Sequence, residues 1–178
     1  MALRRPGMLS SARPHPTERI IRIPALGLSV RVRVAHLGVE GGPTVIETMN
    51  AAGFGPLLYR RAEAEIFQVA SGRYLFEVDG QRFVARRGDM VCVPGGAARA
   101  FVNITGTGAR QQVIIHPGLD AAALFSHLAD VLDLQGTPSG EPLEQRPQCF
   151  GLRWGIEFLG GPLSADVESC AADDFGEG

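Results

Sequence analysis

Two stretches of the sequence carry polar side chains that could do chemistry. The stretch GFGPLLYRRAEAEIFQVASG contains Tyr59, Arg61 and Glu65, and the stretch GDMVCVPGGAARAFVN contains Arg99. An arginine guanidinium is always charged and binds carboxylate-like anions through paired hydrogen bonds, whereas a carboxylate or a phenol can move a proton. If these side chains meet in one place, they would bind an anionic or enolate-like group and transfer a proton.

The elements that hold these residues are expected to be β-strands. Alternating or β-branched runs, separated by short turns, cover residues 18–23, 28–36, 44–49, 64–70, 73–78, 81–87, 89–94, 99–104 and 110–116. The Asp79-Gly80 pair between two of these runs is a strong hairpin signal, because both turn positions tolerate a positive φ. Many short strands with no helices between them predict an all-β sandwich or barrel.

Helical periodicity appears only after the strands, in LDAAALFSHLADVLDL. Its stripe on one helical face consists of Leu119, Ala123, Leu124, His127, Leu128, Val131 and Leu132. The later stretch QCFGLRWGIEFLGGPL is interrupted by glycines and predicts a short helix or turn on the outside of the barrel, with Trp154 as a packing residue. We therefore expect a flexible N-terminal tail over 1–16, a barrel over 17–118, a helical extension over 119–163 and an acidic flexible tail over 164–178.

The spacing of the two polar stretches resembles the conserved motifs of the cupin superfamily. The first motif, G-x5-H-x-H-x3,4-E-x6-G, is matched at its glycines and glutamate, and the second, G-x5-P-x-G-x2-H-x3-N, at all but its histidine. The matching positions are Gly53, Glu65, Gly72, Gly88, Pro94, Gly96 and Asn103. The resemblance covers about residues 40 to 118 and implies the cupin double-stranded β-helix, a jelly-roll barrel. The sequence is similar to those of single-domain quercetin-dioxygenase-like and polyketide-cyclase-like cupins.

The sequence departs from the family at the metal ligands. In metal-dependent cupins three histidines and the glutamate converge on a metal ion, but here the histidine positions hold Tyr59, Arg61 and Arg99. A guanidinium has no lone pair to offer a metal and repels a cation. We therefore expect no metal and no other cofactor at this site. Nor do His15, His36, His116 and His127 form a metal-ligand pattern elsewhere.

The resemblance implies that Tyr59, Arg61, Glu65 and Arg99 point into the barrel together, since residues two apart on a strand share a face. Two interpretations stay open. Glu65 either neutralises the arginines in a buried ion pair that only fills the barrel, or the excess of two guanidinium groups over one carboxylate attracts an anionic ligand. The second interpretation makes these four residues the catalytic candidates.

The candidates for substrate binding lie on neighbouring strands. They are Phe67, Phe101, Gln112, Ile114 and His116 and, at the mouth, Glu47, Met49 and Tyr74. Phe67 is in phase with Glu65, and Phe101 with Arg99, while Gln112, Ile114 and His116 share one face of the last strand of the barrel. For the three residues at the mouth, alternation alone does not settle which face they occupy.

By resemblance, the leading hypothesis is a metal-independent enzyme of small-molecule metabolism, of the specialised or polyketide type. It would isomerise, cyclise or eliminate a small anionic or oxygen-rich substrate, with Arg61 and Arg99 holding an enolate while Glu65 or Tyr59 moves a proton. The alternatives are a binding or sensor cupin for an anionic metabolite, and a cofactor-free or metal-dependent dioxygenase resembling quercetinase. Replacing either arginine by alanine is expected to abolish binding or turnover while the fold persists.

The charge and cysteine content of the sequence indicate which partners and which cellular location to expect. With 17 basic and 19 acidic residues the net charge is −2, so we expect no nucleic-acid or membrane partner. Cys92, Cys149 and Cys170 form an odd set without a C-x-x-C pair, which favours a reducing, cytoplasmic location over a disulfide framework or a zinc site. An exposed edge at residues 18–23 predicts a homodimer.

Overall fold

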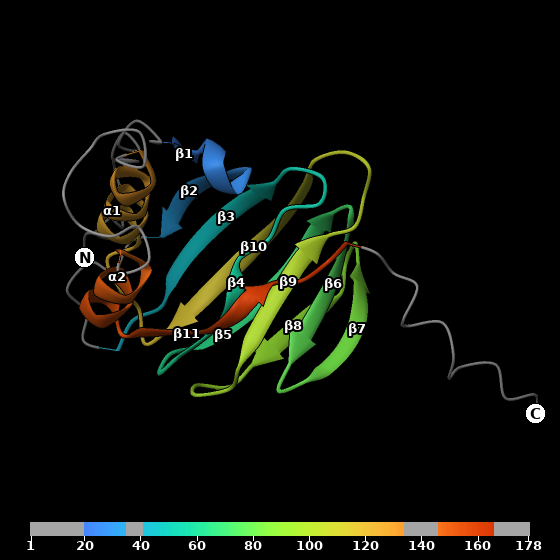
Figure 1. Ribbon diagram of the computed structural model, residues 1–178. Helices are drawn as coiled ribbons and strands as arrows, with labels where there is room; N and C mark the ends of the chain where they lie inside the picture. The colour runs from blue at the N-terminus through green and yellow to red at the C-terminus, as the bar shows by residue number, and fades with distance from the viewer. Residues whose placement is uncertain (1–19, 35–40, 134–145, 166–178) are drawn as a thin grey trace, which may run out of the picture.

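The computed structural model describes residues 20–34, 41–133 and 146–165 of the 178 residues (Figure 1). The predicted N-terminal tail, nearly all of the predicted acidic tail, His15, His36 and Cys170 lie outside these ranges. Two antiparallel sheets face each other and enclose the interior, so the expected all-β jelly-roll class is confirmed.

The first sheet has the strand order β1-β2-β3-β10-β5-β8. Its strands are β1 (Ile20–Ile23), β2 (Leu28–Val34), β3 (Thr44–Asn50), β10 (Ala109–His116), β5 (Ala64–Ser71) and β8 (Met90–Val93). A single 3₁₀ turn, η1 (Pro24–Leu26), joins β1 to β2. All six strands coincide with runs that the sequence analysis marked as strands.

The second sheet has the order β11-β4-β9-β6-β7. Its strands are β11 (Ile156–Pro162), β4 (Leu57–Arg61), β9 (Arg99–Asn103), β6 (Arg73–Val78) and β7 (Gln81–Arg86). The sequence analysis marked β6, β7 and β9, but it did not mark β4 or β11 as strands. The Asp79-Gly80 hairpin is confirmed, because both residues have positive φ and β6 pairs directly with β7.

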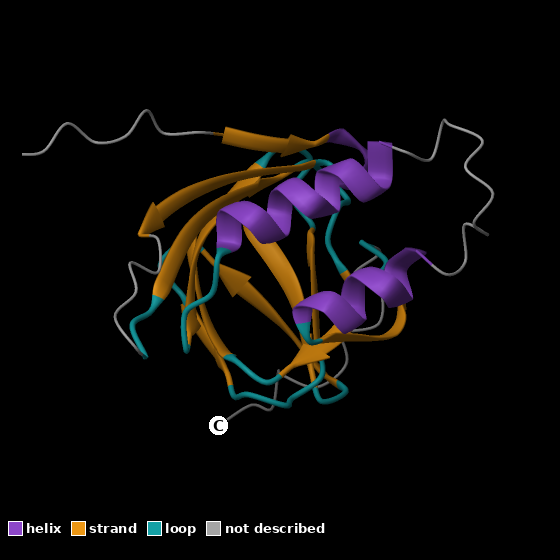
Figure 2. Cartoon of the chain, turned by 90° about the vertical axis from the view of Figure 1, so that its left-hand side faces the viewer, coloured by secondary structure: helices purple, strands orange, loops and turns teal. Residues whose placement is uncertain are grey.

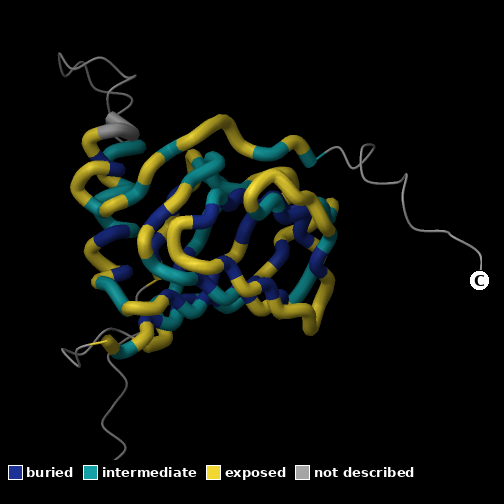
Figure 3. The backbone as a smooth tube through the Cα atoms, turned by 90° about the horizontal axis from the view of Figure 1, so that it is seen from below, coloured by how far each residue is buried: buried dark blue, intermediate teal, exposed yellow. Residues whose placement is uncertain are grey.

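The core lies between the sheets, where the inward positions of each strand meet. On β5 the alternation buries Glu65, Phe67 and Val69, and on β9 every residue is buried. Phe67, Tyr74, Phe76 and Phe101 pack ring against ring, with centroids 5.3 to 6.2 Å apart. Figure 3 shows buried stretches of the backbone mainly in the middle of the molecule and exposed stretches mainly around its outside.

Two helices cover the side where the sheets diverge, between β1 and β2 on one hand and β11 on the other (Figure 2). They are α1 (Ala121–Asp133) and α2 (Arg146–Trp154). Asp120 caps α1, since its Oδ1 accepts a hydrogen bond from the Ala123 amide at 3.0 Å. Neither described helix is long and apolar enough to cross a membrane.

The C-terminal segment completes the barrel and is not merely an outer cover. After Gly155, which has a φ of +63°, the chain enters β11 and pairs with β4 from Ile156 opposite Arg61 to Pro162 opposite Leu57. The glycine-interrupted pattern of this stretch predicted a short helix or turn outside the barrel. That interpretation fits α2 and is wrong for β11, which forms the edge of the second sheet next to two candidate site residues.

Candidate active site in the barrel

A cavity of about 200 Å³ lies between the two sheets, under the helices. Its walls are mainly leucine, isoleucine, valine and phenylalanine side chains, contributed by both sheets, η1, α1, α2 and β11. The polar side chains at its surface belong to Thr48, Asn50, Tyr59, Arg61 and Glu65. An apolar cavity with a few convergent polar groups is the usual form of a small-molecule site.

A hydrogen bond between Tyr59 and Glu65 lies at the centre of the polar end. The Tyr59 hydroxyl donates to Glu65 Oε2 at 2.8 Å, and Arg61 Nη1 lies 3.4 Å from Glu65 Oε1. The Arg61 Nε donates to Glu63 Oε2 at 2.8 Å, so two carboxylates hold the guanidinium. Arg61 and Glu65 are buried, and Arg61 Nη2 has no hydrogen-bond partner among the described residues. That nitrogen is therefore free to donate to a ligand.

Arg99 lies behind this group and does not line the cavity. Its Nη2 donates to the backbone carbonyl oxygens of Arg61 at 3.0 Å and Glu63 at 3.2 Å. Its Nη1 is 3.4 Å from Glu65 Oε2, and its guanidinium lies 5.4 Å from the centroid of the Tyr59 ring. All four catalytic candidates thus converge as expected, but Arg99 supports the other three from outside the cavity.

Strand pairing and a tight turn position the group. Tyr59 on β4 pairs directly with Arg99 on β9, which brings the two polar stretches together. The turn after β4 is held by the Gly96 amide, which donates to the Arg61 carbonyl at 2.8 Å. A side chain at Gly95 would collide with the carbonyl oxygen of Ala62, so only glycine allows this close approach.

The matching pattern of glycines, proline and asparagine around this site agrees with a comparison of the sequence with protein families. Residues 45–116 match the family described as Cupin domain. The protein contains a cupin domain. A search of curated proteins found none that matches this sequence.

Solved cupin structures share the fold at low sequence identity. An RmlC-like cupin from Shewanella frigidimarina has 20% identity and a TM-score of 0.50, covering 61% of this chain and 93% of its own. Pac13, a nucleoside dehydratase, has 11% identity and a TM-score of 0.52, covering 84% of this chain and 90% of its own. A variant of Streptomyces PAC13 with uridine has 11% identity and a TM-score of 0.52, and the match covers 84% of this chain and 89% of that chain. Likeness at this level shows the cupin fold and no more.

The charge states around the cupin cavity follow from burial and pairing. Burial, reinforced by the negative charge of Glu65, raises the pKa of Tyr59 well above its ordinary value. Burial alone would lower the pKa of Arg61, but the charge of Glu65 and the hydrogen bond to Glu63 raise it. Burial would raise the pKa of Glu63, yet the Arg61 hydrogen bond and charge lower it. At neutral pH the site therefore holds a neutral phenol beside a charged guanidinium.

These residues do not fit the metal that many cupins hold. Glu65 is the one retained ligand position, and both of its oxygens already face Tyr59 or a guanidinium. Among the described residues no three His, Cys, Asp or Glu side chains are grouped closely enough to hold an ion. A cation here would lie against two arginines, which disfavours it electrostatically.

Of the predicted binding residues, Phe67 and Phe101 line the cavity. Tyr74 faces inward and is fully buried, but it lies beyond the cavity surface and donates to Asn50 Oδ1 at 3.1 Å. Glu47 and Met49 are on the outer face of β3, and the Glu47 carboxylate accepts from Arg33 at 2.7 Å. They do not reach the cavity.

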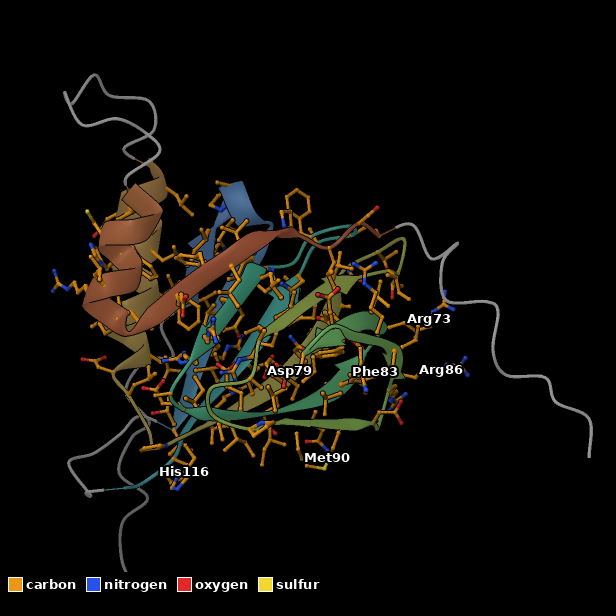
Figure 4. The ribbon with its side chains drawn as sticks, turned by 60° about the horizontal axis from the view of Figure 1, so that its bottom comes forward. Arg73, Asp79, Phe83, Arg86, Met90 and His116 are labelled. Carbon is orange, nitrogen blue, oxygen red and sulfur yellow. The ribbon has the colours of Figure 1, made fainter. Side chains whose placement is uncertain are left out.

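The prediction that Gln112, Ile114 and His116 on β10 face the interior is wrong. The buried residues of this strand are Gln111, Val113 and Ile115, so Gln112, Ile114 and His116 point outward. Figure 4 shows His116 projecting away from the barrel at the end of its strand. The physical reason is that residues 113–115 are apolar on both faces, so alternation does not identify the inner one.

Several cavity residues escaped the sequence analysis. Thr48 and Asn50 face inward from β3, Phe150 comes from α2, and Ile156 and Phe158 come from β11. The helical stripe did contain a usable signal, since Leu124, Leu128, Val131 and Leu132 all line the cavity. Glu63 also had a signal, because an acidic residue two positions from Arg61 lies on the same side of the chain.

Proposed function

We propose that this cupin is a metal-independent enzyme that binds a largely apolar, enolisable or anionic small molecule and catalyses isomerisation, cyclisation or elimination by proton transfer. The observation that carries the proposal is the Tyr59–Glu65 hydrogen bond beside the unpartnered Nη2 of Arg61, at the polar end of an apolar cavity. General acid–base groups next to a fixed cation are the parts that enolate chemistry needs.

The hydrogen-bond direction indicates a relay. Tyr59 already donates its proton to Glu65, so its oxygen can accept a proton from a substrate carbon while its own proton passes to the carboxylate. The C–H bond breaks, an O–H bond forms on Tyr59, a second forms on Glu65, and the substrate keeps the electron pair as an enolate. No free phenolate forms, which agrees with the raised pKa of Tyr59. In the reverse transfer, Tyr59 returns a proton to a different atom of the substrate, and Glu65 gives its proton back to Tyr59.

The charges of the site favour that intermediate. Arg61 and Arg99 are balanced by the carboxylates of Glu63 and Glu65 before the reaction. Once Glu65 has taken up the proton, the site carries one extra positive charge, which the enolate matches. The cavity walls are mainly apolar, so this attraction acts in a medium of lower dielectric constant than bulk water.

Deuterium exchange tests the proposal. We expect the EDTA-treated protein to catalyse exchange of the C1 protons of 2-tetralone, an apolar enolisable ketone, for solvent deuterium, as followed by NMR. Tyr59→Phe and Arg61→Met should each slow the catalysed exchange by about 10²-fold or more, the usual contribution of one general acid–base group for Tyr59 and of one anion-stabilising donor for Arg61. Arg60→Met is the matched control, because Arg60 points outward and pairs with Glu157 at 2.9 Å.

Each contrary outcome has its own meaning. Loss of exchange on metal removal that added metal restores would overturn the metal-independent mechanism. Binding of the ketone without exchange would instead support a binding or sensor protein, and oxygen consumption by the metal-free protein would support a cofactor-free oxygenase.

A further inference from the structure

Glu63 lies outside the cavity and pairs with the arginine that lines it. Its Oε2 accepts a hydrogen bond from Arg61 Nε at 2.8 Å, and its side chain is 24% exposed. The backbone of Glu63 is held as well, because its carbonyl oxygen accepts a hydrogen bond from Arg99 Nη2 at 3.2 Å. Arg61 lines the cavity and Glu63 does not, so Glu63 can influence a ligand only through its charge and through Arg61.

The charges of the four linked side chains sum to zero. Arg61 and Arg99 are each positive, and the carboxylates of Glu63 and Glu65 are each negative. Burial would raise the pKa of Glu63, but the hydrogen bond and the charge of Arg61 lower it, so Glu63 is ionised at neutral pH. Among the described residues that line the cavity, Arg61 and Glu65 are the charged ones, and their charges are opposite. A ligand group therefore meets no net positive charge.

This balance differs from the excess of positive charge that the sequence predicted, because that prediction did not include Glu63. A ligand that enters as an anion would bring a net negative charge into a mainly apolar cavity, which is unfavourable without a counter-ion. A neutral carbonyl group avoids this cost and can still accept a hydrogen bond from Arg61. It becomes negative only when Glu65 takes up the proton, and the charges then match.

We propose that the site selects a substrate whose reacting group is an uncharged carbonyl, such as a ketone, ester or lactone, over a carboxylate, and that Glu63 sets this preference by neutralising Arg61. The inference rests on the proposed function, which it narrows from enolisable or anionic compounds to neutral ones. Glu63 is thus a specificity-determining residue that acts through Arg61 and does not itself touch the substrate.

Two probes of nearly the same shape separate the effect of charge from that of fit. Acetophenone carries a neutral carbonyl group and benzoate a carboxylate on the same ring, and binding of each is followed by protein NMR at about pH 7. We expect the wild type to bind benzoate at least about tenfold more weakly than acetophenone. Glu63→Gln keeps an oxygen that accepts from Arg61 and removes the charge. It should bind benzoate about tenfold more tightly than the wild type does, and acetophenone within about twofold.

Glu157→Gln is the matched control. It removes the same charge from an exposed pair, in which Glu157 Oε2 lies 2.9 Å from Arg60 Nε on the neighbouring strand. Both affinities should be unchanged in this variant. The comparison of the two probes on the wild type needs no substitution, so the proposal stays testable if Glu63→Gln does not fold.

The outcomes distinguish this inference from the proposed function. If benzoate binds the wild type as tightly as acetophenone does, or if neither probe binds, the preference for an uncharged group is refuted. If Glu63→Gln weakens the binding of both probes alike, Glu63 only orients Arg61 and does not set the preference. If the expected binding pattern appears but 2-tetralone shows no deuterium exchange, the proposed reaction fails and the preference for an uncharged group stands.

Discussion

Arg99 donates a hydrogen bond from Nη2 to the backbone carbonyl oxygen of Arg61 over 3.0 Å. One buried guanidinium thereby fixes the backbone of the residue whose own guanidinium faces the cavity. From the sequence the two arginines were expected to be equivalent, each dispensable for the fold. The structure makes them different, because Arg99 pairs with main-chain oxygens in the turn between β4 and β5 from outside the cavity, whereas Arg61 lines the cavity with its Nη2 unpartnered.

Arg99→Met is therefore expected to destabilise the protein. The change removes one hydrogen bond from each of two main-chain carbonyl oxygens, of which that of Arg61 keeps its bond from the Gly96 amide, and it leaves the Glu65 carboxylate without one of its two cations. Removing one member of a buried ion pair lowers the free energy of unfolding by about 3–5 kcal/mol. Urea unfolding of the variant and the wild type measures this difference in the free energy of unfolding. Arg82→Met, which breaks the exposed pair with Glu77, should lower the same quantity by less than about 1 kcal/mol. Equal effects of the two substitutions would show that Arg99 does not support the turn.

Alkaline titration should find neither tyrosine near its ordinary pKa of about 10. Tyr59 and Tyr74 are the two tyrosines of the chain, and burial is the main cause that raises the pKa of both. We expect no phenolate absorbance near 295 nm around pH 10 in the native protein, whereas in guanidinium chloride about half of each phenol should be ionised at that pH. Because the folded-state pKa values are raised, the stabilisation is complete below about pH 10 and is lost as the pH rises above it. One phenolate forming reversibly at pH 10 in native protein would contradict the burial of Tyr59.

Trp154 is expected to hold α2 against α1. Its Nε1 donates to His127 Nδ1 at 2.9 Å, and it packs beside Phe150. Trp154→Phe keeps an aromatic ring and removes the hydrogen bond, so the free energy of unfolding should fall by about 1 kcal/mol. Combining it with His127→Phe should cost less than the sum of the two single changes, which a double-mutant cycle measures. Leu152→Ala, at an exposed position of the same helix, is the control with no expected effect.

Gly55→Ala should be strongly unfavourable. A Cβ at this position would overlap the carbonyl oxygen of Phe101, since the chain entering β4 lies directly on β9. Shifting the backbone to relieve such a clash costs about 1–3 kcal/mol, and here it would also displace the cavity wall. Gly160→Ala is the matched control, with its nearest neighbour, the Leu58 side chain, at an ordinary 3.6 Å. Thermal unfolding of both variants checks the difference.

Much of the fold could be predicted because strand alternation and motif spacing are local. Because alternate residues of a strand share a face, Phe67 was predicted to lie on the same face as Glu65, and both do face the interior. The same rule failed on β10, because Val113, Ile114 and Ile115 are all apolar and Ile114 on the outer face is itself partly buried. To decide which face of β10 is buried, one must know which strands pair with it, and the alternation of its own residues does not give this information.

The site was predictable where it depended on residues in the matched motifs and not where it depended on distant ones. The convergence of Tyr59, Arg61 and Glu65 followed from their register. The strand from Ile156 could not be predicted, since glycines and a proline interrupt its pattern and its partner lies about a hundred residues earlier. Tertiary pairing, rather than local propensity, makes that segment a strand.

The placement of β11 beside β4 has a consequence for how cupins of this shape diversify. The polar group lies within residues 45–116, whereas much of the apolar wall comes from η1, the two helices and β11, all outside that region. Substitutions in these flanking segments can reshape the ligand space without touching Tyr59, Arg61 or Glu65. Related chains that keep the same polar group can thus accommodate ligands of a different shape by changing only the parts of the chain that surround the shared domain.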